Sequence, residues 1–137
     1  MNEQVWAMRT NSPSPERLSR YRRGHIAEWL AAAAMLARGH RILGRRVRTP
    51  YGEIDLIGVR GRRLAFVEVK ARASRLEAEA ALTSRQAGRI ARAAQFWVSR
   101  HAAFRDYDRG LDAVLVMPGR LPIYLRDALQ GTPAIQR

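Results

Sequence analysis

The sequence lacks cysteine altogether and contains only one lysine. Without cysteine, a disulfide scaffold, a cysteine-ligated zinc site and a thiol nucleophile are excluded. Long apolar runs are also missing, since even the stretch from Gly24 to Ala37 is interrupted by Glu28 and is too short to span a bilayer. Residues 1–11 lack the apolar core of a signal peptide. We therefore expect a soluble, cytoplasmic protein with no membrane partner.

Acidic residues are few, and the charge balance is strongly basic. The 137 residues include 25 Lys+Arg against 12 Asp+Glu, a net charge of +13. Such a surplus favours a polyanionic partner, with nucleic acid first, an anionic membrane surface second and an acidic protein third. An alternative is that arginine serves only as the solubilising residue of an arginine-rich proteome.

Lys70 stands out because every other basic residue in the chain is arginine. Lysine is a compact point charge whose pKa can be moved by burial, whereas arginine is a planar, permanently charged fork. A position that retains lysine in such a chain indicates a requirement for a compact ammonium group in place of a guanidinium. The alternative is accident.

Apolar periodicity and turn residues predict one α/β domain with the element order α-β-β-β-α-β-β. Its mixed central sheet is flanked by helices, and the long connection after the third strand makes the third and fourth strands parallel. Ile26, Leu30, Ala33 and Ala37 are expected to form the buried stripe of the first helix. The expected segments are a tail at 1–13, a domain at 14–130 with helices at 15–38 and 84–103 and strands at 41–48, 52–59, 64–71, 111–117 and 121–125, and a tail at 131–137.

Three ionisable residues lie within strands that otherwise read as buried. Asp55 has apolar neighbours on both sides, and Glu68 and Lys70 share one face of the next strand by the period of two. Burying such groups costs several kcal/mol each unless they pair or hold a metal. Two carboxylates, Asp55 and Glu68, suit Mg²⁺, and Lys70 could orient a water or stabilise charge developing on a phosphate. The alternative is a salt bridge at the strand end.

The segments Gly52–Ile57 and Phe66–Lys70 together resemble the PD-(D/E)xK nuclease signature, with the D at Asp55 and the ExK at Glu68 and Lys70. The closer similarity is to the YraN family of small bacterial proteins, and it extends from about residue 22 to residue 129. Relatives of this family include archaeal Holliday-junction resolvases and restriction-type endonucleases. The resemblance therefore implies a restriction-endonuclease-like fold and hydrolysis of DNA phosphodiester bonds, branched DNA included, with Mg²⁺ or Mn²⁺ as cofactor. A homodimer is a further implication, with Phe96, Phe104 or Trp6 available for an interface.

Accessory positions are less sharply defined. The resemblance implies an additional acid at Glu28 and a polar contact at Gln86, where we expect lysine in the family; the alternatives are an exposed helix residue and a helix-start glutamine. Glu53 is expected to be solvent-exposed. Asp112 is expected to have a structural role, capping a turn or pairing with Arg109. The three histidines are scattered without ligand spacing, so a histidine-based site is not expected.

Several arginines are candidates for contacts with nucleic-acid phosphates, which give affinity rather than sequence recognition. One group is a stripe on the second predicted helix, opposite Ile90, and others are expected at loop ends. A protein that binds nucleic acid without cutting it, and a basic adaptor that docks an acidic protein, remain alternatives to a nuclease. The candidate phosphate contacts are Arg85, Arg89, Arg92, Arg45 and Arg46, with further ones at Arg60, Arg62 and Arg63.

Overall fold

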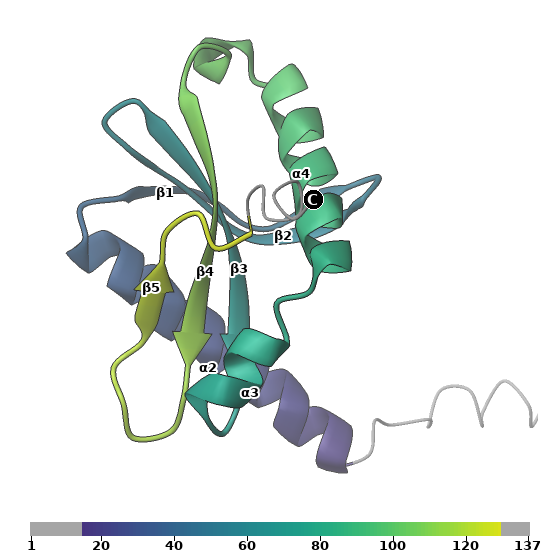
Figure 1. Ribbon diagram of the computed structural model, residues 1–137, viewed down its shortest axis with the longest axis vertical. Coiled ribbons are helices and arrows are strands. Elements are labelled where there is room, and N and C mark those ends of the chain that lie inside the picture. Colours follow the sequence, from purple (N-terminus) through teal and green to yellow (C-terminus); the bar gives the residue numbers. More distant parts are fainter. Residues whose placement is uncertain (1–14, 130–137) are drawn as a thin grey trace, which may run out of the picture.

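The computed structural model describes residues 15–129 (Figure 1), so the tails expected at 1–13 and 131–137 lie outside this range. No helix in the described range is both long and apolar enough to cross a membrane. The elements are, in chain order, α2 (Pro15–Ala37), β1 (Arg41–Thr49), β2 (Gly52–Arg60), β3 (Arg63–Ala71), α3 (Arg75–Ala80), α4 (Ser84–Ser99), the 3-10 helix η1 (Ala102–Phe104), β4 (Asp108–Val116) and β5 (Ile123–Leu125).

These strands form one mixed sheet in the order β1-β2-β3-β4-β5. Neighbouring strands are antiparallel except for β3 and β4, which run parallel because the chain crosses over through α3 and α4 between them. The sequence-based prediction of an α/β domain with a mixed sheet is confirmed, and the arrangement is consistent with a restriction-endonuclease-like fold. In the connection 71–82, where the sequence fits a loop or a frayed helical turn, the short helix α3 forms. Three bounds differ from the expected ones by more than one residue: α4 ends at Ser99 rather than near residue 103, β4 begins at Asp108 rather than residue 111, and β5 begins at Ile123 rather than residue 121.

Helices α2 and α4 cover opposite faces of the sheet (Figure 1). On the α4 face, Ile90 and Trp97 pack in one buried cluster with Phe66 of β3. On the other face, Ala27 and Met35 of α2 belong to a second buried cluster, which also holds Leu56, Val67 and Val114. Strand β3 is therefore covered on both sides, as its continuous apolar sequence indicates.

The expected inward stripe of α2 is wrong. Ile26 and Leu30 are 58% and 43% exposed, and Ala33 and Ala37 are exposed as well. The buried face instead consists of Ala27, Ala31, Ala32 and Met35. The helix is apolar on nearly every side between residues 24 and 37, so periodicity does not single out one face; the face of small side chains lets the helix approach the sheet closely.

Gly58 of β2 lies where this close approach leaves least room. A Cβ atom there would lie 2.5 Å from Cε of the fully buried Met35 and 3.3 Å from the Arg41 carbonyl oxygen. Gly58→Ala should therefore lower the free energy of unfolding by about 1–3 kcal/mol through overpacking. Gly88→Ala is the matched control in α4, where the nearest atom would be at 3.5 Å and the exchange should stabilise the helix by about 0.5–1 kcal/mol. Urea unfolding of both variants tests this, and equal stabilities would contradict it.

Candidate active site

Asp55 lies where β2 and β3 stop pairing. The antiparallel register runs from Arg60↔Arg63 to Leu56↔Val67 and ends there. Asp55 precedes Leu56 in β2, just beyond the last paired residues. Its Oδ2 accepts a hydrogen bond of 2.8 Å from the Val69 amide of β3. A side-chain carboxylate is thus held between the two strands at the point where they separate.

Glu68 and Lys70 lie on the next strand and share a face, as predicted. Both are buried, with exposed fractions of 6% and 9%. Glu68 Oε2 lies 3.6 Å from Lys70 Nζ, and Glu68 Oε1 lies 3.2 Å from Nη2 of Arg89 in α4. Arg89 also donates a hydrogen bond to the Glu53 carbonyl oxygen at 3.0 Å. The Glu68 carboxylate is therefore held by a lysine from its own strand and an arginine from the helix that packs over it.

The surroundings of Asp55 disfavour its ionised form. Burial, followed by the negative charge of Glu68, raises the pKa of Asp55 to about 7, and Glu28 adds to this effect. The hydrogen bond from the Val69 amide and the charge of Lys70 act in the opposite direction. A carboxyl group whose ionised form is disfavoured by burial and by a neighbouring carboxylate is one that a bound cation would stabilise in that form.

The oxygen donors fit a hard divalent cation. Among residues 15–129 no group of three or more histidine, cysteine, aspartate or glutamate side chains is arranged to hold a metal. The candidate ligands are the two carboxylates that the sequence indicates, Asp55 and Glu68. Mg²⁺ is commonly bound through one or two carboxylates and keeps several waters. Glu68, which is buried, and Asp55, which is half-buried, therefore form a carboxylate pair that suits Mg²⁺ or Mn²⁺.

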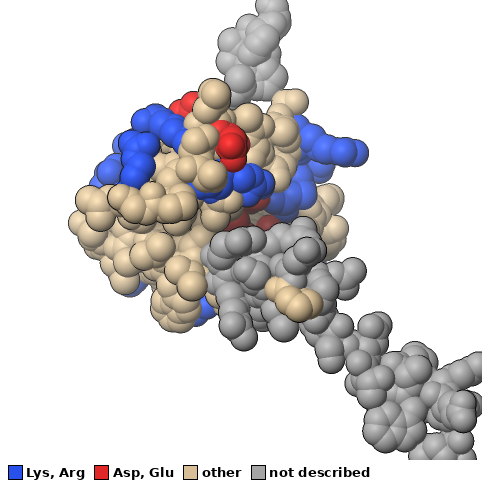
Figure 2. Space-filling view, turned by 90° about the horizontal axis from the view of Figure 1, so that it is seen from below, with Lys and Arg blue, Asp and Glu red and all other residues tan. Residues whose placement is uncertain are grey.

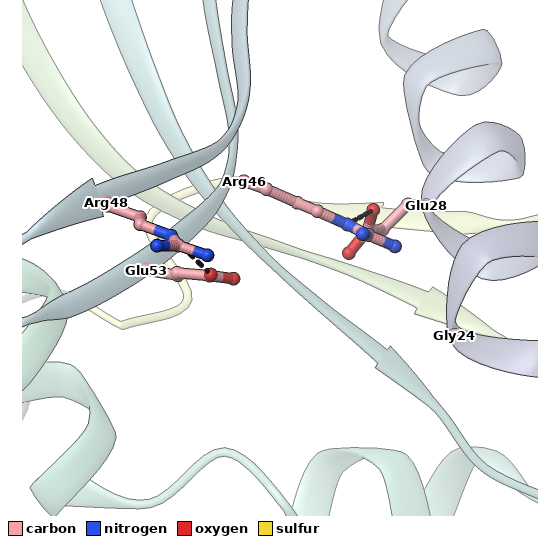
Figure 3. Close-up of a pocket in the computed structure, with 5 residues that line it drawn as sticks. All are labelled: Gly24, Glu28, Arg46, Arg48 and Glu53. Atoms are coloured by element: carbon pink, nitrogen blue, oxygen red, sulfur yellow. Dashed lines mark hydrogen bonds and ion pairs between the residues drawn. The ribbon is translucent and has the colours of Figure 1, made fainter. Parts of the chain in front are cut away.

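Glu28 reaches the site from α2. Its side chain is only 14% exposed and accepts a hydrogen bond of 2.8 Å from Arg46 Nε, an ion pair that joins α2 to β1 (Figure 3). Arg46 also contacts His25 and has a positive φ of 50°. Glu28 is therefore a largely buried carboxylate and not a solvated helix residue. Its negative charge contributes to the raised pKa of Asp55.

A cavity of about 460 Å³ lies beside this ion pair. Glu53 lines it and pairs with Arg48 at 3.6 Å across the β1–β2 hairpin (Figure 3). The Glu53 side chain is 49% exposed, as expected from its position near the start of β2. The Glu53 carboxylate therefore lies at the rim of the cavity and is not grouped with Asp55 and Glu68.

Gln86 lies in the first turn of α4, with its backbone amide hydrogen-bonded and its side-chain oxygen without a partner in the described part of the chain. Its backbone amide donates to Thr83 Oγ1 at 3.2 Å, so that Thr83 caps the helix. Its side-chain Oε1 is buried and has no hydrogen-bond partner in the described part of the chain. A buried acceptor of this kind is available to a water or a ligand.

The candidate phosphate-binding arginines are only partly on open surface. Arg85 and Arg92 are exposed on α4, but Arg89, which follows the same helical spacing, is only 27% exposed because its guanidinium reaches Glu68. Arg45 and Arg46 lie within β1 rather than at a loop end; Arg45 stacks on the Trp29 ring at 4.2 Å. Basic side chains nevertheless lie next to recessed acidic atoms on one face of the molecule (Figure 2).

Asp112 has the structural role expected of it, but with another partner. It lies in the middle of β4, fully buried, and pairs with Arg63 at 2.8 Å instead of Arg109. Arg63 is therefore also unavailable as a simple surface contact. The partners of Glu68 and Asp112, Arg89 and Arg63, are the residues that sequence reasoning missed, because many arginines compete for each acid in this chain.

Comparison with known proteins agrees with the resemblance of the strand motifs. The uncharacterised protein family UPF0102 matches residues 27–116. A UPF0102 protein of Mesorhizobium japonicum is 49% identical over 87% of this chain and 95% of the relative. A UPF0102 protein of Rhodopseudomonas palustris strain BisB18 is 48% identical over 90% of this chain and 91% of the relative. The chain therefore belongs to UPF0102, the YraN family of uncharacterised proteins.

Proposed function

We propose that this protein is a metal-dependent nuclease that hydrolyses phosphodiester bonds in DNA. The observation that carries the proposal is the convergence of Asp55, Glu68 and Lys70 where β2 and β3 separate. Their burial is costly unless it serves a ligand or a pair, and the raised pKa of Asp55 indicates that pairing inside the chain is incomplete. The net charge of +13 supports a polyanionic substrate.

Each side chain then has a distinct task. Asp55 and Glu68 would hold the divalent cation, which when bound polarises a phosphoryl oxygen and lowers the pKa of a bound water. The Lys70 ammonium, beside Glu68, stabilises the negative charge that develops on the phosphate or orients the attacking water. Gln86 Oε1 can accept a hydrogen bond from a water. Glu28 acts on Asp55 through its charge.

A second function, binding nucleic acid without cutting it, is favoured by one observation. Both oxygens of Glu68 have cationic partners within the chain, Lys70 and Arg89. If the protein does not cut, Glu68, Lys70 and Arg89 form a structural ion cluster, and nucleic acid is bound through the basic surface alone.

Asp55→Asn separates these functions, with Glu53→Gln as a matched control on the same strand. We expect Asp55→Asn to weaken Mn²⁺ binding, measured by calorimetry, and to reduce Mg²⁺-dependent cleavage by about 100-fold or more, because it removes a ligand oxygen and its charge. Glu53→Gln should preserve both properties, since Glu53 lies on the rim.

Cleavage should be measured on linear duplex, single-stranded and four-way-junction DNA at low salt. Wild-type protein that binds these DNAs but neither binds Mn²⁺ nor cuts any of them would favour the non-cutting function. If it binds no DNA at all, the nucleic-acid hypothesis is wrong and an acidic protein partner becomes the leading candidate.

A further inference from the structure

A groove of about 1080 Å³ leads away from the candidate active site. Asp55 of β2 lines it, then Val69 and Ala71 of β3, then Val116 and Met117 of β4. Because these strands are neighbours in the sheet, the groove crosses their ends from Asp55 toward the loop that follows β4. Any substrate held at Asp55 can therefore extend along this groove.

The walls of the groove are apolar side chains that water reaches. Ile26 and Leu30 of α2 form one wall, and Leu121 in the loop after β4 lies on the lining as well. Their exposed fractions are 58%, 43% and 86%. Apolar side chains gathered at a concave surface, and not scattered singly, indicate a ligand with apolar faces.

Cations complete the lining. Arg72 and Arg120 both border the groove and are exposed. Neither takes part in an ion pair among the described residues. The groove therefore combines apolar contact with two guanidinium groups available to phosphate oxygens.

We infer that this groove holds an unpaired strand of nucleic acid, with bases against Ile26, Leu30 and Leu121 and phosphates near Arg72 and Arg120. Duplex DNA keeps its base faces stacked inside the helix and presents mainly charged backbone, so apolar walls contribute little to holding it. An unpaired strand offers base faces and phosphates together. The inference rests on the proposed function and narrows its substrate to single-stranded DNA or DNA with a single-stranded portion.

Leu121→Asn tests the inference, with Leu76→Asn as the matched control. Leu76, in α3, is 77% exposed and does not line the groove, and both exchanges leave the charge unchanged. The full-length protein is titrated, without divalent cation, into labelled oligothymidylate, an abasic oligonucleotide with the same number of phosphates, and a duplex.

The wild type should bind oligothymidylate about tenfold more tightly than the abasic strand, a difference in the range of contacts between one base and a side chain. Leu121→Asn should remove most of this preference without changing affinity for the abasic strand or the duplex, and Leu76→Asn should behave as the wild type. Thermal unfolding should be the same for all three proteins, since both leucines are exposed.

Several results would overturn the inference: no preference of the wild type for oligothymidylate over the abasic strand, an unchanged preference in Leu121→Asn, or an equal loss in Leu76→Asn. Polyglutamate that binds as tightly as oligothymidylate, with the same loss in Leu121→Asn, would assign the groove to an acidic protein instead. If Leu121→Asn loses the preference but the wild type cuts no DNA, the nuclease hypothesis is wrong and the assignment of the groove to an unpaired strand is supported. If the wild type cuts duplex DNA and Leu121→Asn keeps the preference, the nuclease hypothesis is supported and the assignment of the groove is wrong.

Discussion

Lys70→Met is expected to reduce metal-dependent DNA cleavage by about 10²–10³-fold while the protein remains folded. The Lys70 ammonium lies 3.6 Å from Glu68 Oε2, and its side chain is only 11% exposed. In such a poorly solvated place a positive charge interacts strongly with charge developing on a phosphate. Methionine keeps most of the apolar stem and removes the charge. Single-turnover rates at saturating Mg²⁺ measure the loss without interference from product release.

Lys70→Arg is the more discriminating exchange because it preserves charge. We expect it to lose most of the activity too, since a planar guanidinium cannot replace a compact ammonium beside Glu68, whose other oxygen already contacts Arg89. Arg92→Met removes a positive charge from the exposed surface of α4 and should change cleavage little at saturating DNA. Nearly wild-type single-turnover rates in Lys70→Met would show that Lys70 only balances the charge of Glu68.

The convergence of Asp55, Glu68 and Lys70 was predictable because it depends on short-range geometry. Strands β2 and β3 are joined by a tight turn, so their register follows from the turn. The period of two then places Glu68 and Lys70 on one face. The inward position of Ile90 on α4 was equally predictable, because the helical pattern of this segment is clear.

The buried face of α2 was not predictable in the same way. Between residues 24 and 37 only Glu28 is polar or charged after His25, so two different apolar stripes fit the helical period. The sheet selects the stripe of small residues, since Gly58 and Ala65 lie under the helix. Side-chain size in the facing strands decides this, and that information lies far away in the sequence.

The arginine partners depend on tertiary structure in a similar way. Arg63 and Asp112 are 49 residues apart and meet only because β3 and β4 are parallel neighbours. Arg89 reaches Glu68 because α4 packs over the strand. With 24 arginines in the chain, neither choice of partner can be read from spacing.

Asp112 forms the most extensively satisfied polar cluster of the described fold. It is fully buried and accepts hydrogen bonds from both Nη atoms of Arg63, at 2.8 and 2.9 Å. The Tyr124 hydroxyl and the Asp127 amide also donate to it. Burial alone would raise the pKa of Asp112, but these hydrogen bonds outweigh it and hold the pKa below its ordinary value. The cluster joins β3, β4 and β5.

Asp112→Asn is expected to lower the free energy of unfolding by about 3–5 kcal/mol, because it removes the buried counter-charge of the Arg63 guanidinium and leaves only Asp127, whose side chain is 50% exposed. Urea unfolding measures the change. Asp108→Asn, an exposed position on the same strand, should stay within about 0.5 kcal/mol of the wild type. Removing both charges in Asp112→Leu/Arg63→Met should recover much of the loss, because an apolar pair of similar volume avoids the desolvation cost.

Gly110→Ala should produce the same defect by a different route, since the new Cβ would lie 1.8 Å from Arg63 Nη2 and displace the guanidinium from Asp112. The pH dependence supplies an independent check. A carboxylate with a lowered pKa in the folded state contributes stability above its unfolded pKa of about 3.9, and this contribution is lost as pH falls through the folded pKa. The stability difference between wild type and Asp112→Asn should therefore be constant near neutral pH and narrow below about pH 4. A difference that persists unchanged in acid would mean that Asp112 acts through its shape and hydrogen-bond geometry rather than through its charge.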